Sequence, residues 1–171
     1  PLKVVSITED FAAIAHRIGG QYVQTYALVK GSRNLHHVIP KPSMVVHVRS
    51  ADLLLRLGMS QDSWIDDLIQ TARNKDVFPG SKGYIDCSVG IRALEVPMTS
   101  IDGSQGDMHL EGNPHYWLNP LNGKIIAKQL LDRLTLLIPD QKAYFEKNYQ
   151  FFCDQIDQKM VGWTKKFQAM D

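Results

Sequence analysis

The chain has 171 residues, 22% of them charged, and a formal net charge of +1. This length suits one domain with a full hydrophobic core and is short for two complete domains. The balanced charge and the lack of a basic run argue against nucleic acid and anionic membranes as partners, and no apolar run approaches the roughly 20 residues that span a membrane.

The first half of the chain alternates between strand-like and helix-like segments. A buried strand is expected at residues 2–7, followed by a helix that Thr8 caps and Gly19 and Gly20 end. Further strands are expected at 22–29, 52–57 and 84–88, and further helices at 42–49 and 63–73. This alternation predicts an α/β fold, a Rossmann-like parallel sheet of four strands flanked by helices on both faces.

A long loop and two helices are expected in the second half. Residues 95–120 are rich in glycine and proline and lack periodicity, so we expect a functional loop. A helix is predicted at 120–138, and a final one at 141–168 would extend about 42 Å, longer than a domain of this size is wide. Gly162 is the expected place for any break. The last turns, with Met160, Trp163 and Phe167, should project beyond the domain.

The two cysteines, Cys87 and Cys153, lack the close spacing of metal-binding cysteines. They are expected to be buried free thiols. A disulfide between them, in an oxidising compartment, is the alternative.

Two histidines stand in loops that prolines stiffen. His115 lies between Pro114 and Pro120, and a Pro-Lys-Pro segment follows His36. Both loops follow strand candidates, and ligands of open α/β sheets bind at the carboxyl ends of the strands. His36 and His115 are therefore predicted to bind one metal ion, with His109 as a candidate third ligand.

The remaining histidines are given lesser roles. His37 neighbours His36, and adjacent side chains in an extended segment point apart. His16 and His47 lie within helix-like patterns, so they are expected to be structural or solvated.

Four motifs occur together in this chain: Arg17-Ile18-Gly19-Gly20, the His36 loop with Pro40-Lys41-Pro42-Ser43, Ala51-Asp52-Leu53 with Trp64, and Gly112-Asn113-Pro114-His115-Tyr116-Trp117-Leu118-Asn119-Pro120-Leu121-Asn122. With them the chain resembles the periplasmic or surface solute-binding proteins of ABC transporters for zinc and manganese. The resemblance implies two α/β lobes joined by a long helix, with the metal between the lobes. Residues 1–139 would be the metal-binding lobe and 140–171 the linker helix, with the second lobe missing.

The resemblance also implies a function. The chain would capture zinc in the first place, or manganese in the second, for an ABC transporter membrane permease, and it would not be an enzyme. It would be an exported bacterial protein, made with a signal peptide and found in the periplasm or on the cell surface. Without the second lobe, we expect self-association through the exposed linker helix.

Some residues depart from the family pattern and keep other functions open. Leu35 stands where proline is common, His37 is an extra histidine, and no long His-rich loop is present. One alternative is a zinc-dependent hydrolase with Asp107 or Glu111 as general base. Another is a metal-binding adhesin on the same scaffold.

Overall fold

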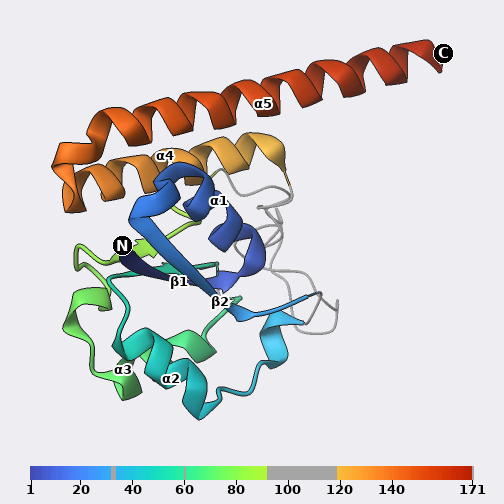
Figure 1. The fold of residues 1–171 in the computed structure, drawn as a ribbon. Coiled ribbons are helices and arrows are strands. Elements are labelled where there is room, and N and C mark those ends of the chain that lie inside the picture. Colours follow the sequence, from blue (N-terminus) through green and yellow to red (C-terminus); the bar gives the residue numbers. More distant parts are fainter. Residues whose placement is uncertain (32–33, 60, 92–118, 171) are drawn as a thin grey trace.

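The computed structural model describes residues 1–31, 34–59, 61–91 and 119–170. It confirms the predicted α/β fold, with a parallel four-stranded sheet, flanking helices and a long C-terminal helix (Figure 1). The main elements are β1 Leu2–Thr8, α1 Glu9–Gly19, β2 Val23–Val29, α2 Pro42–Arg49, β3 Leu53–Arg56, α3 Trp64–Ala72, β4 Tyr84–Asp86, α4 Pro120–Leu137 and α5 Lys142–Ala169.

The sheet has the strand order β2-β1-β3-β4, and every neighbouring pair is parallel. Most residues of its two central strands are apolar because helices cover both of their faces. The side chains of Val4, Leu53, Leu54 and Leu55 are at most 1% exposed. Since all strands run the same way, their carboxyl ends meet at one edge. The strand order reverses between β1 and β3, which is where open α/β sheets form a ligand crevice.

The helices form two layers. α1, α4 and α5 pack together on one face of the sheet, and α2 and α3 pack on the other (Figure 1). α1 begins as predicted, because Thr8 Oγ1 accepts a hydrogen bond from the Phe11 amide at 3.3 Å. It ends at Gly20, whose φ of 52° is in the left-handed region that favours glycine.

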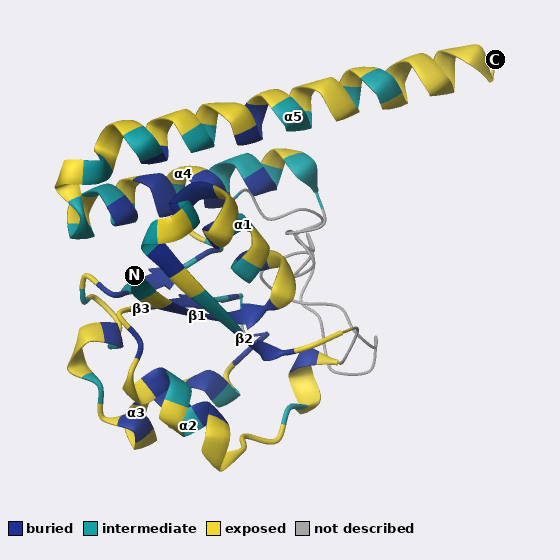
Figure 2. Cartoon of the chain, in the orientation of Figure 1, coloured by how far each residue is buried: buried dark blue, intermediate teal, exposed yellow. Residues whose placement is uncertain are grey.

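The C-terminal helix belongs to the core for only part of its length. Phe145, Phe152 and Cys153 of α5 are buried against the rest of the molecule. α5 runs without interruption through Gly162, so the predicted long helix is confirmed and no break occurs there. The C-terminal part of the helix extends away from the body (Figure 2), and Trp163 and Phe167 are 49% and 72% exposed.

The two cysteines are free and buried, as predicted. Burial raises the pKa of the Cys87 thiol well above its usual value, with Asp86 and Asp62 adding to the effect. Across the described residues, no helix combines the length and apolarity that crossing a membrane requires.

Candidate metal site

The first predicted ligand, His36, lies in a 3₁₀ turn that follows β2. The turn spans Leu35–His37, and the Asn34 side chain starts it by accepting a hydrogen bond from the His36 amide at 2.9 Å. The Asn34 carbonyl accepts a second one from the His37 amide at 3.3 Å. Leu35 is buried while both histidines are exposed. The turn thus anchors one apolar side chain and presents two imidazoles to solvent.

The backbone at His37 is not extended as predicted, because residues 35–37 form a 3₁₀ turn. In such a turn, successive side chains are about 120° apart around the axis and do not point to opposite sides. His36 keeps its place as the candidate ligand through its position in the motif.

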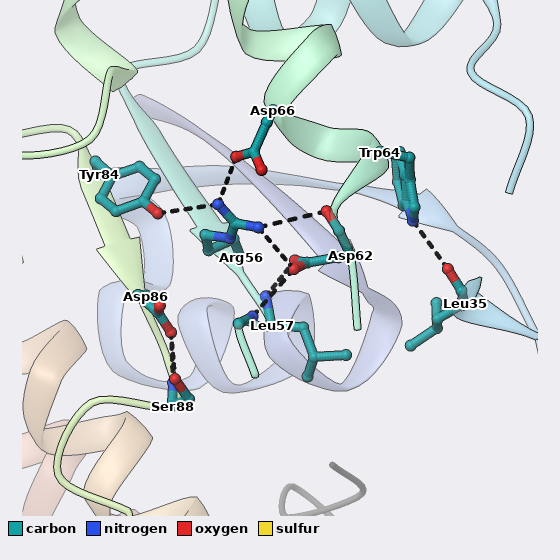
Figure 3. A network of polar contacts seen from close by, with 10 residues as sticks. Leu35, Arg56, Leu57, Asp62, Trp64, Asp66, Tyr84, Asp86 and Ser88 are labelled. Carbon is teal, nitrogen blue, oxygen red and sulfur yellow. Dashed lines mark hydrogen bonds and ion pairs between the residues drawn. The ribbon is translucent and has the colours of Figure 1, made fainter. Parts of the chain in front are cut away.

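A hydrogen bond from Trp64 connects this turn to the start of α3. Its indole Nε1 donates a hydrogen bond to the Leu35 carbonyl at 2.9 Å (Figure 3). Trp64 is the first residue of α3 and is partly buried against the core. The start of α3, which follows β3, is therefore bonded to the turn that follows β2.

An ion pair between a buried carboxylate and a partly buried guanidinium holds the loop between β3 and α3. The Asp62 side chain is 0% exposed, and its carboxylate accepts hydrogen bonds from the amides of Leu57 at 2.7 Å and Gly58 at 3.2 Å. Arg56 Nη2 donates to the same carboxylate at 2.9 Å (Figure 3). Arg56 Nη1 donates to Asp66 at 2.6 Å and to the Tyr84 hydroxyl at 3.3 Å. One guanidinium therefore joins β3, β4 and α3.

The charges of this pair are only partly compensated. Burial raises the pKa of Asp62, although the nearby Arg56 and the backbone amides favour its charged form. Burial is the largest single influence on Arg56 and lowers its pKa, but the charge of Asp62 and the hydrogen bonds with Asp62 and Tyr84 together outweigh it, and the net direction is upward. Arg56 therefore stays charged, and removal of Asp62 would leave that charge with poorer compensation.

The loops after β3 and β4 pack closely at the same edge. Gly58 has a φ of 75°, and a Cβ atom there would overlap the Asp86 carboxylate and the Ser88 hydroxyl. Asp86 accepts hydrogen bonds from the Ser88 amide at 2.9 Å and from its hydroxyl at 2.6 Å. Met59 has a φ of 53°, which is rare for a residue with a side chain. The close contacts and the unusual backbone angles at this edge therefore restrict which residues can occupy it.

The other predicted ligands, His109 and His115, lie outside the described residues. Within the part of the chain that the structure describes, no group of three His, Cys, Asp or Glu side chains could hold a metal ion. The described chain resumes at Asn119, whose side chain caps α4 by accepting from the Leu121 amide at 2.9 Å. Gln129, in the middle of α4, donates to the carbonyl of Val89, so this part of α4 lies beside the segment that follows β4.

Two residues expected to have structural or solvated roles fit that expectation. His47 stacks on Tyr26, with ring centroids 3.5 Å apart and an interplanar angle of 12°. His16 is exposed on α1.

Sequence reasoning missed the polar network. The hydrogen bond from Trp64 to the His36 turn was not predicted. Arg56 and Asp62 are residue types that usually lie at the surface, and nothing in their spacing marks them as a buried pair. Only the tertiary structure shows that Asp62 is enclosed.

A family model described as periplasmic zinc-uptake complex component A (ZnuA) matches residues 4–171. Manganese ABC transporter substrate-binding lipoprotein PsaA of Streptococcus pneumoniae serotype 4 is 27% identical over 173 residues, which cover 99% of this chain and 52% of the relative. Metal ABC transporter substrate-binding lipoprotein SsaB of Streptococcus sanguinis is 28% identical, over 91% of this chain and 48% of the relative. The chain thus spans about half the length of these relatives.

Solved structures resemble the fold. A periplasmic metal binding protein from Candidatus Liberibacter asiaticus superposes with a TM-score of 0.78 at 20% identity, over 99% of this chain and 58% of that one. Zn(II)-bound AdcA from Streptococcus pneumoniae superposes with a TM-score of 0.70 at 22% identity, over 92% of this chain and 31% of that one. At these identities the likeness concerns the fold alone.

Proposed function

The chain belongs to the family of periplasmic zinc-uptake complex component A, and on this premise we propose that it captures a divalent transition metal for an ABC importer. One observation carries the proposal. His36 is presented by an ordered turn that follows β2 and is hydrogen-bonded through Leu35 to the start of α3, which follows β3, so the turn reaches across from β2 to the loop at the point where the strand order reverses. That is where a protein of this architecture binds its ligand.

His36 and His115 are proposed as ligands from this chain, with His109 as a third. Asn119 follows His115 by four residues and caps α4, and the middle of this helix lies beside the segment that follows β4, which supports their convergence. The described residues hold no complete metal cluster, so the proposal needs these further donors. Residues 1–139 would form the metal-binding lobe and 140–171 the linker helix. Additional ligands would come from the part of the relatives that this chain does not span.

Zinc is proposed as the first cargo and manganese as the second. Imidazole nitrogen suits zinc, and the general affinity order of divalent metals also places zinc above manganese. The similar proteins include both metals: PsaA is a manganese protein by name, and AdcA was solved with zinc bound. The ratio of the dissociation constants for zinc and manganese is therefore the quantity to measure.

The proposed role is binding without catalysis. A carrier that fills the coordination sphere of its metal leaves no activated water, and none of the relatives named above is called an enzyme. The partner would be the membrane permease of the importer. The protein would act in the periplasm or at the cell surface, in keeping with relatives named as lipoproteins and periplasmic proteins.

His36→Ala should weaken zinc binding by more than the ~10–100-fold that follows loss of a residue hydrogen-bonded to a ligand. His115→Ala should do the same. His37→Ala is the matched control, because it removes an exposed imidazole from the same turn. Isothermal titration with zinc, and then with manganese, measures the dissociation constants of all variants.

Three results would contradict parts of this proposal. Zinc binding at the parent affinity in both His36→Ala and His115→Ala would rule out this site. Loss of binding in His37→Ala alone would move the ligand by one residue. A parent protein that binds manganese more tightly than zinc would reverse the proposed order of cargo.

A further inference from the structure

We propose that Trp64 is a positioning residue, whose indole N–H fixes the peptide group that carries His36. The proposal rests on the proposed function, in which His36 binds the metal. It concerns a contact between two loops that are 29 residues apart in the chain.

The peptide that joins Leu35 to His36 is held at both of its polar atoms. Its carbonyl oxygen, which belongs to Leu35, accepts the hydrogen bond from Trp64 Nε1 at 2.9 Å. Its N–H, which belongs to His36, donates to Asn34 Oδ1 at 2.9 Å. Because the peptide is planar, two opposite restraints fix the orientation of the whole group. That orientation fixes the Cα atom and the N–Cα bond of His36, and so limits the directions in which its side chain can leave the backbone.

The donor is itself held in place. The Asp62 carbonyl accepts a hydrogen bond from the Ile65 amide at 2.9 Å, one residue after Trp64. The Asp62 side chain is in turn bonded to Arg56 and to two backbone amides of the preceding loop. The restraint on His36 therefore runs through Trp64 and Asp62 to the sheet (Figure 3).

The turn needs such a restraint because it is short and open to solvent. A single 3₁₀ turn has weak hydrogen bonds of its own, and the 3.3 Å contact from the His37 amide is long. Buried Leu35 anchors the turn but does not set the angle of the following peptide. Loss of the indole N–H should therefore loosen the orientation of His36 while leaving the turn attached.

Trp64→Phe tests this, since it keeps an aromatic ring and removes the donor. Zinc alone is the probe, and its dissociation constant should rise by about tenfold, the lower end of the effect of groups that orient metal ligands. The second readout needs no metal: amide hydrogen exchange by NMR should be several-fold faster at His36 in the metal-free variant. Amides of β1 and β3 should keep the parent rates.

Two controls separate positioning from general destabilisation. Trp163→Phe makes the same chemical change at a half-exposed position on the projecting part of α5 and should alter neither readout. Asn74→Ala removes a side chain that donates to the carbonyls of Val48 at 3.0 Å and Ala51 at 2.8 Å, near the start of β3 at the opposite edge. It should lower stability without a selective change at His36.

Asn34→Ala removes the other restraint on the same peptide and serves if Trp64→Phe does not fold. It should also accelerate exchange at His36, and the two effects should not add in the double variant. Unchanged exchange at His36 in Trp64→Phe would overturn the proposal. If His36→Ala binds zinc like the parent, the metal site is wrong, while faster exchange at His36 in Trp64→Phe still supports the restraint.

Discussion

Asp62→Ala is expected to lower the free energy of unfolding by about 3 kcal/mol or more, which is typical for breaking a buried ion pair. The substitution leaves the Arg56 guanidinium with less compensation for its charge. It also deprives the Leu57 and Gly58 amides of their acceptor, and a buried donor without a partner costs about 1–3 kcal/mol. Urea denaturation followed by circular dichroism measures the change.

Asp66→Ala is the matched control because both carboxylates contact the same guanidinium. The Asp66 side chain is 56% exposed, whereas that of Asp62 is 0% exposed. An exposed ion pair contributes about 1 kcal/mol at most, so Asp66→Ala should have a small effect. Equal losses in the two variants would mean that burial of Asp62 does not determine the strength of the network.

The fold could be predicted from the sequence because local signals agree with tertiary structure. The leucines of β3 are apolar on both faces, as the centre of a parallel sheet requires. α2 has the predicted bounds, since Pro42 is suited to the first turn of a helix and the residue before it is extended. Thr8 and Gly20 mark the ends of α1 in the same way.

The site could be predicted only in outline. The motif around His36 identified a candidate ligand, but the backbone of its turn was assigned wrongly, because three residues are too few to show a period. The connection from Trp64 to Leu35 spans two loops and has no local signal. The Asp62 pair is a consequence of how β3, β4 and α3 meet, which residue type and spacing do not encode.

Phe145→Ala is expected to lower the free energy of unfolding by about 3–5 kcal/mol, the usual cost of truncating a buried phenylalanine. Its ring is 0% exposed and packs edge-on against Tyr22, with centroids 5.9 Å apart. Tyr22 lies between α1 and β2, so α5 is joined to the body of the domain at this point. Thermal and urea unfolding should both show the loss.

Phe167→Ala makes the same substitution on the same helix. Both variants gain the same helix propensity, so the two positions differ in how deeply the ring is buried. Phe167 is 72% exposed, and its removal should change the unfolding free energy by no more than about 0.5 kcal/mol in dilute solution. A large loss at Phe167 would show that this face is covered in solution. If that loss grows with protein concentration, a second copy covers it, as the proposed self-association requires, because dimer stability depends on concentration.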